Sequence, residues 1–587
     1  MIGLGLHIAG YHLGKNLFKN ASPIKIATYS FFCQVIYLVA KKAMQNPEII
    51  RNWKNKIFST FYSITNISSI QKIANQFFKT NEKELSLEEK VGQLLMIHFQ
   101  GETANENAQR LIQEIKVGGI IYYNFSNSLN SPLQIKSLSE GLQKLASIPL
   151  LVATDQEGGL VTRATNGFTV FPGNKALAKT GDPKLAQAAA YAMGIELQAV
   201  GINMNLAPVA DVNTNPKNPI IGIRSFGQTF ESVFHFVKSA LIGYQAAKII
   251  TTLKHFPDHG DTETDSHTSL PCILKNIEEL EKTSLPHFCK LALLADAVMT
   301  AHILVPALDA ENCSTLSIKT LSILRKTGFQ GVIISDSLVM EGVLKKCGEP
   351  GEAAIQAFNA GCDILLLGGK QLVGKNSLEL SSTDIQQIHQ SLVDAVKEGR
   401  ISESRLNESV QRILKLKHLK ELPRNSVRLD KILKTKEHLA LSLKIASLAL
   451  EIIPKNACSL TTLKDLQKKQ ISIFCPDLLQ EKIKETDLPT ISNKVKTSFF
   501  KDINFLESEI KEAYTSDVLI ALSYNAWENE TQRKLIESLI KTEKPLILLV
   551  MRDPIDQELF RQAELTFIAF SPTAVSIQAI TNKLKKF

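Results

Sequence analysis

The stretch PLLVATD (residues 149–155) decides the fold, because it joins a short apolar run to a polar residue at its end. Such a run is typical of a strand that is buried on both faces of a parallel sheet. Seven further runs share this character and alternate with helix-like segments: VGQLLMIHF (91–99), VGGIIYYN (117–124), GINMNLAPVAD (201–211), IITTLKHF (249–256), DAVMTAHILV (296–305), GVIISD (331–336) and CDILLLGG (362–369). Eight strand–helix units over roughly 300 residues predict a (β/α)₈ TIM barrel rather than an open sheet.

A second, shorter alternation follows the amphipathic segment ISESRLNESVQRILKLKHL (401–419), which we expect to be the closing helix of the barrel. Its apolar runs are QISIFCPD (470–477), DVLIALSYN (517–525), PLILLVMRDP (545–554) and LTFIAFSPT (565–573). They predict a smaller α/β sandwich domain, and the absence of a glycine-rich phosphate loop argues against a nucleotide. A chain of 587 residues is too long for one ordinary domain. We therefore expect an N-terminal extension at 1–85, a catalytic barrel at 86–420 and a C-terminal sandwich at 421–587.

The first 85 residues differ from the rest of the chain. ATYSFFCQVIYLVA (27–40) is a mostly apolar run between lysines, but a spanning helix needs ~20 apolar residues. As a signal peptide, the run lies late in the sequence and lacks a clear cleavage site. A membrane anchor, an uncleaved signal and a helical appendage all remain open. We expect a helical N-terminal extension, with membrane association through residues 1–85 as one alternative.

Composition excludes few functions. Hydrophobic residues make up 44% of the chain and charged residues 21%, which is typical of a globular protein. The net charge is +9, but lysines and acidic residues are interspersed and no nucleic-acid-binding module is recognisable, so we expect no nucleic-acid partner. The excess of positive charge would equally suit a membrane surface or an anionic glycan. The eight cysteines form no CxxC pair and indicate reduced, mostly buried thiols in a reducing compartment.

The segment KHFPDHGDTETDSH (254–267) concentrates three histidines and several acidic residues. His255 and His259 have the spacing of a zinc-binding helix. However, Pro257 lies between them and Gly260 follows, and an interior proline costs a helix ~3 kcal/mol. We therefore expect a loop without a bound metal, and a metal site is the outside alternative.

Polar residues stand at the ends of the predicted strands, where a parallel barrel carries its chemistry. Because the carboxyl ends of all eight strands lie on one face, we expect these side chains to surround one site. They are Asp155 and Arg163 after the run at 149–155, Arg224 after 201–211, Lys254 and His255 at the end of 249–256, His302 within 296–305 and Asp336 after 331–336.

These residue types suit the cleavage of a sugar acetal, which needs a carboxylate nucleophile and a proton donor. Asp336 is the candidate nucleophile, although an aspartate at a strand end often caps the next helix. His267 is the natural donor, because an imidazole with a pKa near ~6.5 both donates and accepts a proton near neutral pH. Asp265, two residues earlier, would orient its ring, or the two form only a solvated pair. Arg163, Arg224 and Lys254 supply donors for sugar oxygens or form structural ion pairs.

Four motifs carry a family resemblance: DQEGGLVTR (155–163), IGIRSFG (221–227), KHFPDHGDTETDSH (254–267) and SDSLVMEG (335–342). Together they resemble glycoside hydrolase family 3, and most closely its β-N-acetylglucosaminidase (β-N-acetylhexosaminidase) branch, which processes cell-wall muropeptides. The resemblance covers about residues 86–420 and extends more loosely to the C-terminal domain, as in two-domain members. It implies a retaining, exo-acting hydrolase in the bacterial cytoplasm or at a membrane.

The resemblance also implies roles for individual residues. Asp336 matches the nucleophile, His267 the acid/base and Asp265 its dyad partner. Positions that match the N-acetylglucosamine site are Asp155, Arg163, Arg224, Lys254 and His255. The implied partners are GlcNAc-containing oligosaccharides or muropeptides, with no cofactor and no metal.

One departure from the family concerns Asp258, which stands where the family loop has glycine. If the position requires a positive φ, aspartate occupies it at some cost, and its charge would raise the pKa of the dyad histidine. Other readings are a family 3 β-glucosidase or β-xylosidase, a glycoside phosphorylase and a non-catalytic glycan-binding protein. The intact DSH sequence (265–267) argues against a β-glucosidase or β-xylosidase. The joint presence of Asp336, Asp265 and His267 argues against a non-catalytic protein.

Overall fold

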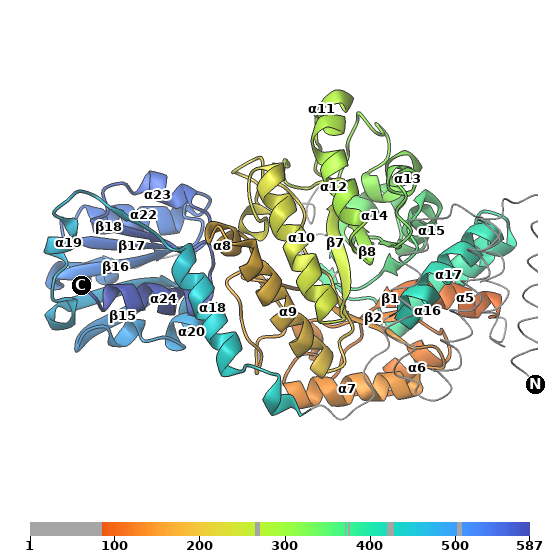
Figure 1. The fold of residues 1–587 in the computed structure, drawn as a ribbon, viewed down its shortest axis with the longest axis horizontal. Helices are drawn as coiled ribbons and strands as arrows, with labels where there is room; N and C mark the ends of the chain where they lie inside the picture. The colour runs from red at the N-terminus through yellow and green to blue at the C-terminus, as the bar shows by residue number, and fades with distance from the viewer. Residues whose placement is uncertain (1–84, 264–269, 370, 374–375, 420–427, 502–506) are drawn as a thin grey trace, which may run out of the picture. The chain divides into compact units, whose positions relative to one another are not determined.

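The computed structural model describes residues 85–263, 270–369, 371–373, 376–419, 428–501 and 507–587. Within this part of the chain, eight strands form one sheet and six later strands form a second, with helices between them (Figure 1). Both predicted sheets are therefore present, in the predicted order. The N-terminal extension lies outside the described residues except for Leu85, so its helical character and membrane association stay predictions.

The first sheet is closed into a barrel. β10 pairs in parallel with β1, and Ile364, directly before β10, bridges Ile334 of β9. All other neighbouring strands also run parallel. The strands are β1 (Leu95–Ile97), β2 (Gly119–Ile121), β3 (Leu151–Thr154), β6 (Met204–Asn205), β7 (Ile250–Phe256), β8 (Ala297–Thr300), β9 (Val332–Ile334) and β10 (Leu365–Leu366). Each lies inside one of the eight predicted apolar runs, so the predicted (β/α)₈ fold is confirmed.

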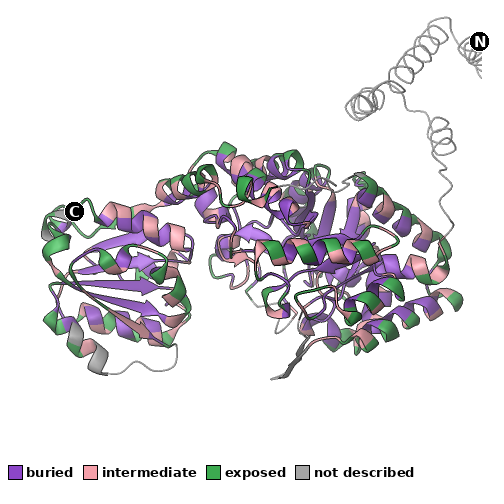
Figure 2. Ribbon diagram, turned by 90° about the horizontal axis from the view of Figure 1, so that it is seen from below, coloured by how far each residue is buried: buried purple, intermediate pink, exposed green. Residues whose placement is uncertain are grey.

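Burial explains why these runs form strands. Every residue of the eight strands is buried, whereas the covering helices bury one face and expose the other (Figure 2). Two long helices lie between β3 and β7 in the sequence, α9 (Pro183–Ala199) and α10 (Phe230–Ala246). The side chain of Asp182 accepts a hydrogen bond from the backbone N–H of Lys184 and caps α9, in which Pro183 stands at a position that requires no N–H. Both helices lie between predicted apolar runs, where helix-like segments were expected.

A short hairpin interrupts the alternation directly after β3. It pairs β4 (Gln156–Gly158) with β5 (Val161–Thr162). The hairpin was not predicted from the sequence, because its strands are only three and two residues long. Its position matters, since it places Glu157 at the mouth of the barrel.

The second sheet is mixed. Its order is β13-β18-β17-β16-β14-β15, with β13 antiparallel to β18 and all other pairs parallel. The strands are β13 (Glu451–Pro454), β14 (Gln470–Pro476), β15 (Lys494–Phe500), β16 (Val518–Ser523), β17 (Leu546–Val550) and β18 (Leu565–Ile568). The four central strands match the predicted runs. The edge strands β13 and β15 were missed, because they are only partly buried and lack a continuous apolar run.

Helix α18 (Lys436–Ala449) joins the barrel to the sandwich. It packs against α24 (Ala574–Leu584) of the sandwich and against α8 (Asn174–Lys179) and α9 of the barrel. His438 Nδ1 lies 2.7 Å from Oε1 of Glu196, a buried residue of α9. The predicted boundary at residue 421 falls within 420–427, outside the described residues, and stays a prediction.

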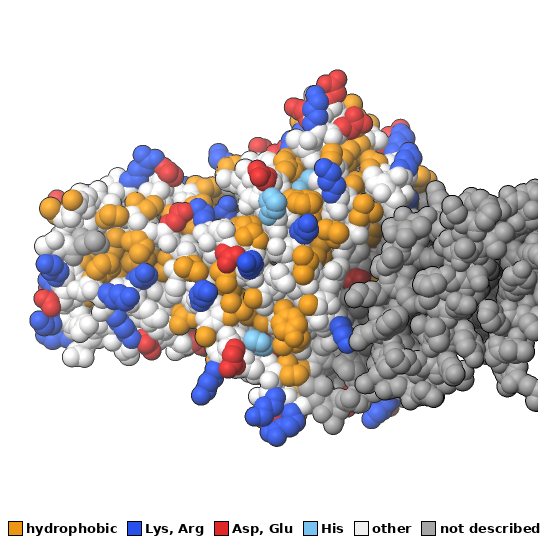
Figure 3. Space-filling view, in the orientation of Figure 1, with side chains coloured by type: hydrophobic (Ala, Val, Ile, Leu, Met, Phe, Trp, Pro, Cys, Tyr) orange, Lys and Arg blue, Asp and Glu red, His pale blue; other side chains and the backbone are white. Residues whose placement is uncertain are grey.

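The surface and the thiols add little to the fold. On the face shown in Figure 3, the described lysine and arginine side chains are scattered among acidic and apolar ones and form no continuous basic stripe. Among the residues that the structure describes, no helix is both long and apolar enough to cross a bilayer. Of the seven described cysteines, Cys272 and Cys458 are exposed, and the other five are buried or half-buried.

A buried ion cluster surrounds Asp363, which lies two residues before β10, at the amino end of that strand. Asp363, fully buried before β10, accepts hydrogen bonds from the guanidinium groups of Arg325 (2.6 Å), Arg405 (3.1 Å) and Arg412 (3.0 Å). Arg405 and Arg412 belong to α17 (Glu403–Leu419), the predicted closing helix. One carboxylate therefore holds the last helix of the barrel to its last strand.

This cluster predicts a large effect of Asp363→Asn on stability. The amide leaves three guanidinium groups without their anion, and breaking a buried ion pair typically costs ~3–5 kcal/mol. We expect a loss of that order in the free energy of unfolding, measured by urea titration with circular dichroism. Asp430→Asn is the matched control, since its pair with Arg428 is exposed and contributes little. Equal unfolding midpoints for both variants would contradict this account of Asp363.

Candidate active site

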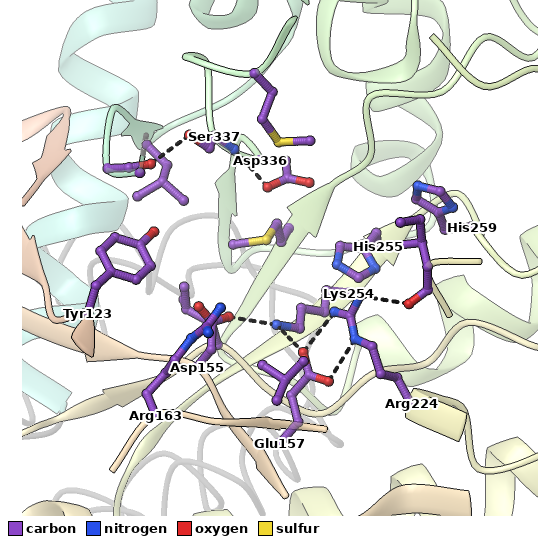
Figure 4. Close-up of a pocket in the computed structure, with 18 of the residues that line it drawn as sticks. Tyr123, Asp155, Glu157, Arg163, Arg224, Lys254, His255, His259, Asp336 and Ser337 are labelled. Carbon is purple, nitrogen blue, oxygen red and sulfur yellow. Dashed lines mark hydrogen bonds and ion pairs between the residues drawn. The ribbon is translucent and has the colours of Figure 1, made fainter. Parts of the chain in front are cut away.

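A cavity of about 490 Å³ lies at the carboxyl ends of the barrel strands. This is the end of a parallel barrel at which catalytic residues are found. Its wall contains most of the predicted site residues, and side chains from several strands converge on it (Figure 4). The predicted residues that line it are Asp155, Arg163, Arg224, Lys254, His255 and Asp336, together with Tyr123, Glu157 and His259, which were not predicted.

Glu157, in β4, is the centre of an ion network on one side of the cavity. Its Oε1 lies 2.7 Å from Nζ of Lys254 and 2.8 Å from Nη2 of Arg224, and Nε of Arg224 donates to its Oε2 at 3.0 Å. Nζ of Lys254 also donates to Oδ1 of Asp155 at 2.8 Å. Two anions thus face two cations in a network that is almost entirely buried.

The pKa values keep this network charged. Burial alone would raise the pKa of Glu157, but the charges of Arg224 and Lys254 hold it well below its usual range. Burial would also lower the pKa of Lys254 and of Arg224, and the neighbouring carboxylates raise both instead. The sequence left open whether these cations form ion pairs or face a ligand. Both pair with Glu157, and both also line the cavity.

Arg163 lies beside this network and has unused hydrogen-bonding capacity. Its backbone N–H donates to the side-chain oxygen of Gln156 at 3.0 Å, which fixes the start of the segment after β5. Its Nε is buried and has no hydrogen-bond partner among the described residues. A buried N–H without a partner is costly, and an oxygen acceptor in the cavity would remove that cost.

Asp211 holds the first residues of the segment 254–267, the histidine loop, in place. Nδ1 of His255 lies 2.6 Å from its Oδ2, and the backbone N–H groups of His255 and His259 donate to its Oδ1 at 3.1 and 2.7 Å. Burial would raise the pKa of Asp211, and the two histidines lower it. Asp211 was missed as a site residue, although its place at the end of the run at 201–211 was a usable signal.

His259 contributes no positive charge at neutral pH. It is fully buried, and burial followed by the neighbouring His255 lowers its pKa to about 4. Its Nδ1 lies 2.9 Å from Oγ1 of Thr262, which fixes the ring within the loop. Within the described residues, no group of three or more His, Cys, Asp or Glu side chains is arranged to hold a metal ion.

Asp336 lies across the cavity from the ion network (Figure 4). It follows β9; its Oδ1 accepts from the N–H of Ser337 at 2.7 Å, and its own N–H donates to Oγ1 of Thr300 at 3.3 Å. His302, placed by the sequence among the polar strand ends, is fully buried behind it, and its Nε2 lies 2.9 Å from the carbonyl oxygen of Ser337. His302 therefore supports the backbone beside Asp336.

The structure does not test the predicted proton donor. Asp265 and His267 both lie within 264–269, outside the described residues, so their roles stay predictions. What is described is the start of their loop, where the segment HFP ends β7 and no helix forms, as Pro257 predicted. The side chain of Asn218 donates to the carbonyl oxygen of His259 at 2.8 Å and to Oγ1 of Thr262 at 3.1 Å.

Asp258 does not require the positive φ that was considered for its position. Its Oδ1 accepts hydrogen bonds from the N–H groups of Val212 (3.1 Å) and Gly260 (3.0 Å), so the side chain bridges two loops. Its Oδ2 is buried without a hydrogen-bond partner among the described residues. Burial, followed by the charge of Asp211, raises the pKa of Asp258 to about 7. The expected extra negative charge is therefore largely absent below pH 7.

The raised pKa of Asp258 predicts a pH-dependent stability. The folded protein binds this proton more tightly than the unfolded chain, whose reference pKa is 3.8, so stability falls as the pH rises from there to about 7. Asp258→Asn removes the ionisation, and we expect its advantage over wild type to grow by up to roughly 1 kcal/mol per pH unit across this window. Urea unfolding at pH 4, 6 and 8 measures this difference.

The control for this series is Asp465→Asn, which changes an exposed carboxyl group of the sandwich domain. Its difference from wild type should be small at all three pH values. A difference between wild type and Asp258→Asn that stays constant with pH would show that Asp258 keeps an ordinary carboxyl pKa.

Comparisons with known proteins agree with this geometry. A family model described as "Glycosyl hydrolase family 3 N terminal domain" matches residues 86–416. Beta-hexosaminidase A of Pseudoalteromonas piscicida is 35% identical over 344 residues, 54% of this chain and 56% of that protein. The chain therefore spans little more than half the length of that relative. Beta-hexosaminidase of Tolumonas auensis is 36% identical over 277 residues, 46% of this chain and 81% of that protein.

A solved structure extends the likeness to both domains. The glycoside hydrolase family 3 beta-N-acetylglucosaminidase of Paenibacillus sp. str. FPU-7 is 34% identical, with a TM-score of 0.77. The match covers 86% of this chain and 97% of that one. The predicted family resemblance and the two-domain form are thus confirmed. Since the family model covers more than half of the sequence, the chain belongs to glycoside hydrolase family 3.

Proposed function

We propose that this protein is a retaining exo-β-N-acetylglucosaminidase that releases terminal GlcNAc from peptidoglycan fragments. The observation that carries the proposal is the cavity at the strand ends, with Asp336 on one wall and the network of Asp155, Glu157, Arg224 and Lys254 on the other. The relatives named beta-hexosaminidase and the family 3 beta-N-acetylglucosaminidase fold support the choice of sugar. The peptidoglycan origin of the substrate rests on the resemblance to the muropeptide-processing branch.

In the proposed reaction, the carboxylate of Asp336 attacks the anomeric carbon of the terminal sugar. The bond from that carbon to the leaving oxygen breaks, and His267 donates a proton to the oxygen as it leaves. An ester then links the sugar to Asp336. Water attacks the anomeric carbon, His267 accepts a proton from this water, and the carboxylate of Asp336 is released. Asp265 fixes the imidazole tautomer and stabilises its charged form.

The ion network has the groups needed to hold the sugar. In a water-poor pocket, charged donors and acceptors form strong hydrogen bonds with hydroxyl and carbonyl oxygens. We assign Asp155, Arg163, Arg224, Lys254 and His255 to this task. Glu157 contributes indirectly, because it neutralises and orients the two cations that line the cavity. Because ion pairs already hold these side chains in place, less conformational entropy is lost when the substrate is positioned.

The first test compares p-nitrophenyl β-N-acetylglucosaminide with the β-glucoside, in the presence of EDTA. We expect turnover of the acetamido sugar and its loss in Asp336→Ala, because the other described carboxylates that line the cavity, Asp155 and Glu157, lie in the ion network on the opposite wall. The unfolding temperature of the variant, measured beside that of wild type, shows whether the fold is kept. Preference of the wild type for the glucoside would favour a β-glucosidase, and a requirement for phosphate would favour a phosphorylase.

A second test addresses the predicted proton donor. General acid catalysis contributes ~10²–10⁴-fold, so His267→Ala should slow the hydrolysis of substrates with poor leaving groups by that order. Activated aryl glycosides need little protonation and should be affected much less during glycosylation. The measurement is kcat/KM over a series of leaving groups of different pKa. A rate on natural disaccharides equal to that of wild type would remove His267 from this role.

A further inference from the structure

The turn at 218–225 connects the two loops of the site. Ile220 and Arg224 both line the cavity, and the last three residues before Ser225 form the short helix η2 (Gly222–Arg224). The side-chain oxygen of Asn218 accepts from the N–H groups of Ile220 (3.0 Å) and Ile221 (2.7 Å). The same amide donates to the histidine loop at His259 and Thr262, so a shift of the turn displaces both Arg224 and the start of that loop.

This turn is contacted from the sandwich domain, more than 300 residues away in sequence. Nη2 of Arg552 donates to the carbonyl oxygen of Pro219 at 3.0 Å. The carboxylate of Asp553 lies against Gly222, so closely that a Cβ atom there would stand 2.9 Å from Oδ1. Gly222 also has a φ of +43°, which L side chains rarely adopt. The two residues of the sandwich therefore touch both the beginning of the turn and η2.

Arg552 and Asp553 are themselves held by the rigid sheet of the sandwich. They follow β17, and their neighbours Tyr524 and Asn525 follow β16, the adjacent strand. The guanidinium of Arg552 lies over the ring of Tyr524, 5.2 Å from its centroid, and the N–H of Asp553 donates to the side chain of Asn525 at 3.3 Å. These contacts join Arg552 and Asp553 to the ends of two hydrogen-bonded strands, so the sheet of the sandwich supports the turn.

A second contact holds the backbone of the turn at 218–225. Nδ2 of Asn174 donates to the carbonyl oxygen of Arg224 at 2.7 Å. Asn174 begins α8, which packs against α18, the helix that also packs on α24 of the sandwich. Arg224 is thus held at its side chain by Glu157 and at its backbone by Asn174, whose helix α8 contacts the helix α18 that also packs on the sandwich.

We propose that Arg552 and Asp553 are positioning residues for the substrate site. The C-terminal domain completes the site through them, by fixing the turn at 218–225 without touching the cavity itself. The inference rests on the proposed function for the claim that Arg224 binds the sugar. It assigns the sandwich an indirect part in substrate affinity, beyond its packing on the barrel.

The test uses the full chain with Arg552→Ala and two independent readouts. The first is hydrogen exchange of peptides spanning 218–225 and 258–263, which needs no turnover. The second is KM and kcat for p-nitrophenyl β-N-acetylglucosaminide. We expect faster exchange in both peptides and a KM raised about five- to tenfold, as for the loss of one hydrogen bond to the site, with kcat changed less. Arg552→Lys keeps a donor and should restore part of the affinity.

Two controls separate positioning from general damage to the sandwich. Arg561→Ala removes an exposed arginine of the same domain, and Ser472→Ala removes a buried hydrogen bond of β14 far from the turn. Neither should change exchange at 218–225 or the KM. Gly222→Ala disturbs the contact between the turn and Asp553 by a change in the barrel. It should raise the KM even if Arg552→Ala folds poorly.

The outcomes are distinct. Unchanged exchange at 218–225 in Arg552→Ala overturns the inference, as does faster exchange with an unchanged KM. A wild type that does not act on the glycoside contradicts the proposed function instead, and the exchange data then decide alone whether Arg552 fixes the turn. An effect of Ser472→Ala equal to that of Arg552→Ala would reduce the contact to ordinary domain stability and overturn the inference.

Discussion

Glu157 is a carboxylate buried between two cations, and most of the site depends on that arrangement. A charge taken out of water costs several kcal/mol unless it is paired. Here Arg224 binds it in a bidentate manner and Lys254 from a third direction. The hairpin after β3, the end of β7 and helix η2 therefore must keep their relative positions. Moving any one of them would leave a buried charge without its partner.

Two glycines of the hairpin allow the backbone to hold Glu157 in this position. Gly158 and Gly159 have φ values of +88° and +62° and pack against the backbone at Pro172 and Gly173. A side chain at Gly159 would overlap the carbonyl oxygen of Pro172. The tight turn follows directly after Glu157, whose side chain reaches Lys254. Local backbone freedom is thus used to bring one carboxylate to the two cations.

Asp211 has the corresponding role for the opposite part of the site. It accepts two backbone N–H groups and one imidazole N–H, so a single carboxylate fixes the strand end and the first residues of the histidine loop. Asp258 reinforces this junction in its protonated form, since two ionised carboxylates so close together would repel each other. The turn at 218–225 then links this junction to Arg224 and, through Arg552, to the sandwich.

The sequence by itself determined the eight barrel strands, four strands of the sandwich and the strand-end residues Asp155, Lys254 and Asp336. A strand that is buried on both faces requires a continuous apolar run, which is visible in the sequence. In a parallel barrel, the functional side chains stand directly after these runs. The sequence also determined that no helix forms at 257–263, the described residues that follow β7, because Pro257 disfavours one. Only the tertiary structure showed which groups Glu157 and Asp211 pair with. Their partners lie 67 and 44 residues away, and no local sequence pattern indicates such a pairing. The same reason applies to Arg552, whose contact with Pro219 exists only once two separately folded sheets have been packed together.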